Sequence, residues 1–340
     1  MRSEGRVVAV TGADGFIGRN LVVRLEELGF QVRPITPATA AEGLGSAEIV
    51  FHLEGAGASA ATVVRHIADG GRRPLVIVGA ASEGAFLQLA AQGMATVAIY
   101  RLPEVFGKWA SPAPASIVST FCRELSQGRP LSIDDASVPL SLLYVDDLIE
   151  QWTSLIGRPP AASGIQEAAG VHQTTVGEVA AILSAFAEGR RRGEIENVGS
   201  GLERALYATY VAALPTEAFS YPLTVHTDPR GSFAEVIKTR DGGQVSVLTA
   251  EPGAVRGGHY HHSKVEKFLV VHGQARFRFR HILSGETYEL TTSAAEAVVV
   301  ETIPGWTHDI TNVGSGVMVS LLWASEVFDR ERPDTVMAPL

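Results

Sequence analysis

The stretch RVVAVTGADGFIGRNLVVRL, residues 6–25, joins a short apolar run to an amphipathic helical pattern through three evenly spaced glycines. The apolar run is typical of a parallel strand that is buried on both faces, and the leucines after the turn recur at helical spacing. Glycine at such a turn lets the backbone approach a pyrophosphate, which then lies on the N–H groups at the start of the helix. The predicted cofactor-binding residues are Gly12, Asp14, Gly15, Phe16, Ile17 and Gly18. A tight turn without a ligand is the alternative.

Beyond this turn, the first half of the chain alternates β-prone runs with helical patterns. PLVIVGA (74–80) and TVAIYRL (96–102) are β-prone runs, whereas DDLIEQWTSLI (146–156) has its apolar residues at helical spacing. Such alternation is typical of α/β folds that are built on a parallel sheet. We therefore expect a Rossmann-like α/β domain.

Near residue 215 the pattern changes to short β-prone runs that glycine, proline and aspartate separate, such as KFLVVHG (267–273) and MVSLLWA (318–324). Regularly spaced short strands favour a sandwich or a small barrel. The change lies within residues 205–222. We therefore predict two domains, 1–212 and 213–340.

The composition narrows the class of protein. A chain of 340 residues is comfortable for two domains. A net charge of −9 argues against nucleic acid as the main partner. The single cysteine, Cys122, excludes an internal disulfide and fits a reducing compartment. No apolar run approaches the roughly 20 residues that cross a bilayer, and no signal peptide precedes the first strand. We expect a cytoplasmic protein with no membrane partner.

GGHYHHSKVEKF, residues 257–268, holds three of the ten histidines of the chain. His259 and His261 are two residues apart, so they face the same side of a strand, and Glu266 can return from the next strand after a turn. The histidine–glutamate spacing between Gly253 and Gly273 reproduces the first sequence motif of the cupins.

PGWTHDITN (304–312) resembles the second cupin motif and would supply His308 as a fourth ligand. The resemblance predicts an all-β cupin domain, a double-stranded β-helix, with a metal bound by His259, His261, Glu266 and His308. Such nitrogen and oxygen ligands suit Zn, Mn, Fe, Ni or Co. A polar barrel without metal is the alternative. His262 should point to the opposite face.

In the first half, TGADGFIG (11–18), YRLPEVFGKW (100–109) and LLYVDDLI (142–149) resemble the extended short-chain dehydrogenase/reductase (SDR) superfamily. Reductases of that superfamily use a Tyr-x-x-x-Lys pair, in which the lysine prepares the tyrosine to exchange a proton with the carbonyl oxygen. The only lysine before residue 238 is Lys108, and no such pair exists here. Glu54 and Glu83 are alternative acids. The second strand ends without an acidic residue, which favours NADP(H) over NAD or indicates degraded cofactor binding.

An SDR domain followed by a cupin resembles the bifunctional SDR–cupin enzymes of capsular-polysaccharide synthesis, which make the UDP-N-acetyl-L-fucosamine precursor. The resemblance implies a nucleotide-diphosphate keto-sugar substrate, a zinc-binding cupin that epimerises C3, an NADPH-dependent reduction of the C4 ketone, and a homodimer formed through the cupin.

Because the tyrosine–lysine pair is absent, we expect metal-dependent epimerisation or isomerisation by the cupin, beside an SDR domain whose reductase activity is doubtful. The complete epimerase/reductase and a non-catalytic dimeric binding protein are the alternatives. The base that removes the proton alpha to the ketone must lie within hydrogen-bond reach of the substrate. The candidates by position in the sequence are Tyr260, Lys264, Lys267, Tyr288 and Asp309.

Overall fold

The computed structural model describes residues 6–36, 39, 43–44, 47–54, 58–79, 83–113, 116–239 and 241–340. The chain forms two compact units. Unit 1 comprises Met1–Ser184 and Gly199–Pro215, and unit 2 comprises Ala185–Val198 and Thr216–Leu340. The domain boundary after residue 212 stays a prediction.

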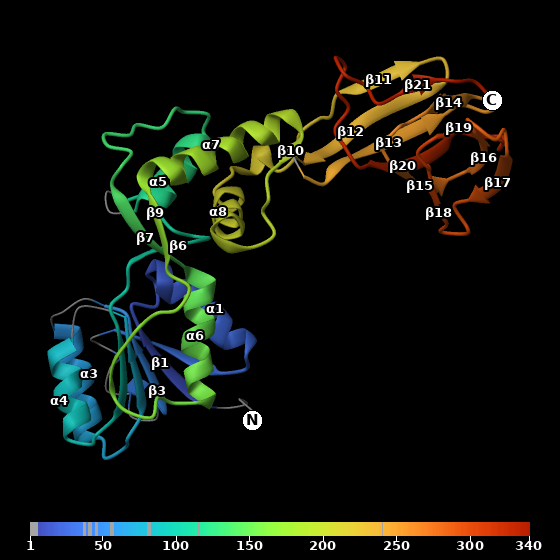
Figure 1. The fold of residues 1–340 in the computed structure, drawn as a ribbon. Coiled ribbons are helices and arrows are strands. Elements are labelled where there is room, and N and C mark those ends of the chain that lie inside the picture. The colour runs from blue at the N-terminus through green and yellow to red at the C-terminus, as the bar shows by residue number, and fades with distance from the viewer. Residues whose placement is uncertain are drawn as a thin grey trace. The chain divides into compact units, whose positions relative to one another are not determined.

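Unit 1 is built on a six-stranded parallel sheet of order β2-β1-β3-β4-β5-β8 (Figure 1). Its strands are β1 (Val7–Thr11), β2 (Gln31–Ile35), β3 (Ile49–His52), β4 (Leu75–Val78), β5 (Thr96–Tyr100) and β8 (Gly164–Gln166). The helices α1 (Phe16–Glu27), α3 (Ala58–Asp69) and α4 (Glu83–Ala91) connect successive strands. The expected α/β architecture is confirmed.

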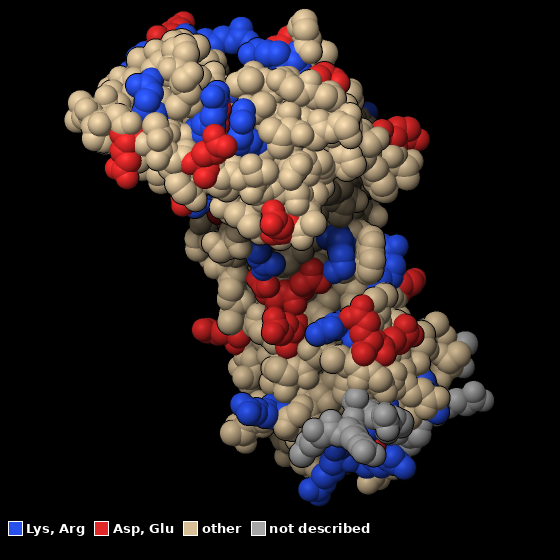
Figure 2. All heavy atoms as spheres, turned by 90° about the vertical axis from the view of Figure 1, so that its right-hand side faces the viewer, with Lys and Arg blue, Asp and Glu red and all other residues tan. Residues whose placement is uncertain are grey.

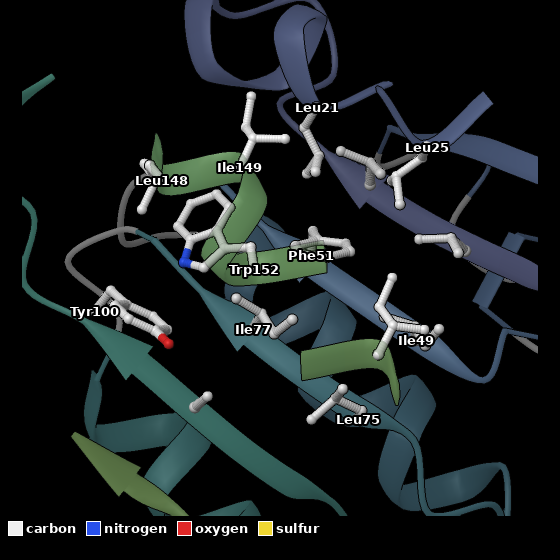
Figure 3. Packing of buried hydrophobic residues seen from close by; sticks show 14 of the residues in the cluster. Leu21, Leu25, Ile49, Phe51, Leu75, Ile77, Tyr100, Leu148, Ile149 and Trp152 are labelled. Atoms are coloured by element: carbon white, nitrogen blue, oxygen red, sulfur yellow. The ribbon is translucent and has the colours of Figure 1, made fainter. Parts of the chain in front are cut away.

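Helices cover both faces of this sheet, with α3 and α4 on one side and α1 and α6 (Val145–Gly157) on the other (Figure 1). Every residue of β3 and β4 is buried, as expected of a strand between two layers. Trp152 of α6 lies against the sheet beside Phe51 and Tyr100, with ring centroids 6.0 and 5.9 Å away (Figure 3). This packing fixes α6 over the centre of the sheet.

The rest of unit 1 is a small sheet, β6-β7-β9, with its helices. The strands are β6 (Glu104–Phe106), β7 (Pro139–Tyr144) and β9 (His172–Thr175), and the helices are α5 (Ile117–Ser126), α7 (Val176–Arg192) and α8 (Gly201–Ala212). The last turns of α7 belong to unit 2.

Unit 2 consists of two sheets that face each other across an apolar core. One has the order β10-β12-β13-β20-β15-β18, with β11 beside β12, and the other β17-β16-β19-β14-β21 (Figure 1). Phe268 of β15 and Phe277 of β16 meet between the sheets, with ring centroids 5.7 Å apart. This is the all-β architecture expected of a cupin.

The first sheet and its entry contain β10 (Glu194–Ile195), η1 (Thr216–Ala218), β11 (Val225–Asp228), β12 (Gly231–Thr239), β13 (Gly243–Ala250), β15 (Glu266–His272), β18 (Val299–Glu301) and β20 (Met318–Ala324). The second contains β14 (Val255–Tyr260), β16 (Gln274–His281), β17 (Thr287–Ser293), β19 (Trp306–Asn312) and β21 (Val336–Met337). Among the described residues of unit 2, every strand pair is antiparallel except β10 with β12.

The outer surface carries charges of both signs. On the face in Figure 2, basic side chains are scattered among acidic ones rather than gathered in one continuous patch. In the part of the chain that the structure describes, no helix has the length and apolar character to span a membrane.

Candidate functional site

Four side chains converge inside the barrel of unit 2. They are His259 on β14, His261 just after β14, Glu266 at the start of β15 and His308 on β19. The nitrogen and oxygen atoms that they could offer to a metal all lie within 4.8 Å of one another. His261, Glu266 and His308 are at most 7% exposed. The residues predicted as metal ligands therefore form one buried cluster.

A turn between β14 and β15 brings Glu266 back to the two histidines. The carboxylate of Asp334 accepts hydrogen bonds from the backbone N–H groups of His262, Ser263 and Lys264, at 2.7–2.8 Å. Three donors on one carboxylate hold the turn closed, because charge-assisted hydrogen bonds are the strong ones. Asp334 was not predicted from the sequence, because it lies 70 residues beyond this turn.

The imidazole rings are oriented as metal ligands usually are. Nδ1 of His261 is hydrogen-bonded to the backbone carbonyl of Asp334, and Nδ1 of His308 lies 3.3 Å from the carbonyl of Trp306. A ring whose Nδ1–H donates to a carbonyl presents an unprotonated Nε2 to a metal. The Nε2 atoms of these two rings lie 3.3 and 3.4 Å from Oε2 of Glu266.

Those separations suit a tetrahedral ion. With metal–ligand bonds of about 2.0–2.1 Å, neighbouring ligand atoms of a tetrahedral zinc site lie about 3.3–3.4 Å apart. The protonation of His259 also suits a metal, since burial, followed by the neighbouring His308 and His261, lowers the pKa of His259 to about 4. A neutral imidazole is the form that binds a metal. The cluster therefore fits a divalent cation.

Glu266 remains ionised in spite of its burial. Burial alone would raise the pKa of its carboxyl group, but the close contacts with the imidazoles of His261 and His308 and the charge of Lys264 lower that pKa well below its usual value. An ionised carboxylate is the form that coordinates a metal.

Of the five predicted proton-transfer residues, only Lys264 lies at the cluster. Its side chain is buried, and its Nζ atom is 3.7 Å from Oε1 of Glu266 and 3.3 Å from Oγ1 of Thr335. Lys264 therefore contacts one residue of the cluster, Glu266, but does not line the cavity that His259, Glu266 and His308 share.

Two of the other four candidates follow the strand alternation to the outer face. The Tyr260 ring packs against the exposed His262 ring, with centroids 5.2 Å apart, which agrees with the outward position predicted for His262. Lys267 is half exposed and forms an ion pair with Glu301. Neither side chain lies among the atoms of the cluster.

Neither of the remaining two candidates has its polar group beside the cluster, although Asp309 lines the cavity next to it. The carboxylate of Asp309 binds the guanidinium of Arg278, on the side of β19 opposite His308. Phe277 and Phe279 occupy the inward positions of β16, so the arginines of this strand face outward. Tyr288 is 58% exposed and lines a separate, mainly apolar cavity.

Arg256 is a further interior residue that the sequence analysis missed. It lines a cavity of about 100 Å³ together with His259, Glu266 and His308. If the side chains of β14 alternated strictly from His259, Arg256 would point outward. The signal in the sequence was the pair Gly257-Gly258, because glycines within a strand often mark a bulge.

The glycine turn of unit 1 has the geometry predicted for it. Gly12 has a φ of +65°, a conformation that glycine adopts readily. A Cβ atom on Gly18 would lie 2.0 Å from the Gly12 carbonyl oxygen, so the helix can approach the turn only with glycine there.

Helix α1 begins after Gly15, and among the described residues no side chain caps it and none of its first-turn residues is acidic. Asp14 is exposed, whereas Phe16 and Ile17 pack partly against the core. The arrangement suits the pyrophosphate of a dinucleotide.

A carboxylate occupies part of this turn. Oε1 of Glu54 accepts a hydrogen bond from the backbone N–H of Gly12 at 3.2 Å.

Lys108 forms an ion pair with Asp146. Glu83 forms two hydrogen bonds with Arg101, and that pairing lowers the pKa of Glu83, which therefore stays ionised and is poorly suited to donate a proton.

Comparisons with known proteins place this chain in one family. The polysaccharide biosynthesis C-terminal domain family matches residues 226–336. A Pseudomonas aeruginosa protein described as UDP-2-acetamido-2,6-beta-L-arabino-hexul-4-ose reductase is 42% identical over 361 aligned positions, which cover 96% of this chain and 97% of the relative. These positions exceed the 340 residues of this chain, so the relative has segments that this chain lacks.

Solved structures agree with this assignment. The capsular polysaccharide assembling protein CapF from Staphylococcus aureus has a TM-score of 0.91 at 32% identity and is matched over 98% of this chain and all of its own. CapF with the inhibitor 3-isopropenyl-tropolone has a TM-score of 0.92 at 35% identity over the same shares. The Bordetella bronchiseptica enzyme WbmF, in complex with NAD+, matches 62% of this chain and 93% of its own at 16% identity, with a TM-score of 0.51, and shows the fold alone.

These findings correct one interpretation of the sequence. The prediction that the cupin acts beside a domain of doubtful reductase activity is wrong, because the relative that matches almost the whole chain is a reductase. The missing tyrosine–lysine pair argued against one proton relay only, whereas an acid of another kind can protonate a carbonyl oxygen during hydride transfer. The chain belongs to the family of UDP-2-acetamido-2,6-beta-L-arabino-hexul-4-ose reductases of nucleotide-sugar and polysaccharide biosynthesis, in which an SDR-like domain precedes a cupin domain.

Proposed function

We propose that this chain is a bifunctional enzyme that epimerises C3 of a UDP-linked 4-keto-6-deoxy amino sugar in the barrel and reduces its C4 ketone with NADPH in unit 1. The observation that carries the proposal is the 42% identity to a hexul-4-ose reductase over 96% of the chain. The four-residue cluster in the barrel supports the epimerase half.

For epimerisation, His259, His261, Glu266 and His308 would hold a divalent ion, zinc by preference. When bound, such an ion supplies Lewis acidity that stabilises negative charge on a carbonyl oxygen. The backbone carbonyls of Asp334 and Trp306 would orient the imidazoles of His261 and His308. Lys264, whose ammonium group contacts Glu266, is the residue that we propose returns a proton to C3.

For reduction, the turn from Gly12 to Gly18 and the first turn of α1 would hold the pyrophosphate of NADPH. The cofactor supplies the hydride when it is bound. The absence of a capping or acidic side chain among the described residues at the start of α1 supports this assignment. The carboxylate of Glu54 opposes it in part, since it lies against the same turn.

The two activities are tested separately. In D₂O without NADPH, the metal-loaded protein should introduce deuterium at C3 of the UDP-linked 4-keto sugar, as followed by mass spectrometry. With NADPH, absorbance at 340 nm should fall only when the sugar is present. A protein that takes up metal fully but shows neither reaction would contradict the proposal.

The family resemblance also supports a homodimer formed through the barrel and a cytoplasmic location. Light scattering on the purified chain tests the first, since a monomer at micromolar concentration would contradict it.

A further inference from the structure

Arg256 faces the interior of the barrel because a bulge shifts the register of β14. Arg256 pairs with Ile310, and His259 pairs with His308, so one residue of β14 between them has no counterpart on β19. Without the extra residue, Arg256 and His259 would lie on opposite faces of the strand, three positions apart. With it, both residues lie on the same face of β14 and line the same cavity.

Two glycines make the bulge. Gly257 and Gly258 have φ values of +95° and +80°. A Cβ atom on Gly257 would lie 2.8 Å from the carbonyl oxygen of His308. The close approach of β14 to β19 therefore requires glycine at Gly257, and the conformation favours it at both positions.

Arg256 lies in a row of side chains that runs across β14, β19 and β16, and its neighbours in that row are apolar. Across β19 it meets Ile310, and the next residue in the row is Phe277 of β16; both are at most 3% exposed. The side chain of Arg256 is only 12% exposed. A charged group in such surroundings is unfavourable unless its donors find partners.

The known partners of Arg256 account for only part of its guanidinium. One terminal nitrogen donates to the backbone carbonyl of Ser232 at 2.9 Å, and the other lies 3.5 Å from the carboxylate of Asp228. The Nε atom is buried, and among the residues that the structure describes it has no hydrogen-bond partner. Asp228 is bound more closely by Arg230, at 2.6 Å, so its charge does not depend on Arg256.

The volume of the cavity around Arg256 limits which part of a substrate can reach its guanidinium. At about 100 Å³ it admits part of a sugar ring, whereas pockets that take a whole ligand of nucleotide size measure several hundred cubic ångströms. The reacting end of a sugar, rather than its diphosphate, fits beside the cluster.

We propose that Arg256 is a catalytic residue of the epimerisation, which donates from its guanidinium to the C4 oxygen of the sugar as that oxygen becomes negative. The inference rests on the proposed function. When the C3–H bond breaks, its electron pair forms the C3=C4 double bond, and the carbonyl π pair moves to the C4 oxygen. The proton passes to the base, and its return to the other face of C3 restores the ketone. A donor that is held in place in a buried cavity stabilises this charge more than it stabilises the neutral ketone.

The test uses C3 deuterium exchange in D₂O with full-length, metal-loaded protein and the UDP-linked 4-keto sugar, without NADPH. Arg256→Met should lower kcat for exchange by about 100-fold or more, with KM changed less than about threefold and metal content unchanged. Arg256→Lys should retain part of the rate, since an ammonium keeps the charge but not the planar geometry. Calorimetric binding of UDP should be unaffected in both variants.

Arg230→Met is the matched control, because it removes the other arginine from Asp228 without touching the cavity; its exchange rate should equal that of the wild type. The proposal is overturned if Arg256→Met keeps kcat within threefold, if only KM rises, or if exchange falls in proportion to lost metal. Should Arg256→Met fail to fold, Arg256→Lys decides, since an unchanged kcat in that variant excludes a geometric role for the guanidinium. Absence of exchange in the wild type would remove the epimerase proposal together with this inference.

Discussion

The barrel site and the glycine turn both depend on tight backbone geometry. They differ in whether a side chain already occupies the place that a ligand would take. In the barrel, the Nδ1 atoms of His261 and His308 contact backbone carbonyl oxygens. The atoms that the four cluster residues could offer to a metal lie close together. At the turn, Glu54 already accepts a hydrogen bond from Gly12. A cation can enter the first site with little rearrangement, whereas a phosphate must come close to a carboxylate at the second. The barrel cluster is therefore better prepared for a cation than the glycine turn is for a pyrophosphate.

Removal of a metal ligand should have the largest effect and should affect the barrel alone. We expect His259→Ala to lose its metal and to lower C3 exchange by about 1,000-fold or more, because both the Lewis acid and its position are lost. Elemental analysis and exchange in D₂O measure the two effects. His262→Ala, on the outer face, is the control. Full metal content and normal exchange in His259→Ala would disprove the ligand set.

Loss of the buried lysine should come next. Lys264→Met is expected to lower C3 exchange by about 100-fold or more, since general acid–base groups contribute roughly 10²–10⁴-fold. Its metal content should remain near that of the wild type. Lys267→Met removes a lysine three residues away that is paired with Glu301 on the outer face, and should exchange normally. Equal rates in the two variants would assign the proton transfer to another group.

A substitution at the glycine turn should have a smaller effect, and it should strengthen ligand binding rather than weaken the activity. Glu54→Gln should tighten NADPH binding by roughly threefold to tenfold, because it removes a like charge from the place where the pyrophosphate is expected. The gain should shrink with added salt. Fluorescence titration measures it, and Glu48→Gln, whose carboxylate pairs with Arg6, is the control. Weaker binding in Glu54→Gln would show that this carboxylate supports the turn instead.

The smallest effect concerns stability and is confined to unit 1. Burial raises the pKa of Glu104, although hydrogen bonds from the backbone of Val118 and Ile117 oppose this shift. A raised pKa means that the folded state binds the proton more tightly, so stability falls as pH rises from the unfolded pKa through the folded one. Glu104→Gln should therefore raise the melting temperature of unit 1 at pH 7 by about 1–3 °C, and leave it unchanged below pH 4. Calorimetry that finds the same gain at both pH values would refute this explanation.

The sequence predicted the features that depend on local spacing. His259 and His261 lie side by side because they are two residues apart, and Gly12 has the positive φ that glycine adopts readily. The α/β and all-β architectures followed from periodicity in the same way.

Features that depend on contacts between distant residues were missed. Asp334 holds the turn before Glu266 from 70 residues away, and Arg256 faces inward only because a bulge changes the parity of its strand. Asp309 was considered as a base because it follows His308, but Arg278 on the neighbouring strand binds its carboxylate. No local pattern reveals such pairings, since they arise when strands meet.

The order in which the chain passes between its two compact units has a practical consequence for dissecting the enzyme. Residues 185–198 belong to unit 2, whereas residues 199–215 return to unit 1. A fragment that begins near residue 213 would therefore lack β10, which pairs with Lys238 and Thr239 of β12. Backbone groups at that end of β12 would be left without their strand partner, and an unpaired strand edge promotes association between copies. A barrel expressed for separate study should start before residue 185, or it should carry a charged substitution along that edge.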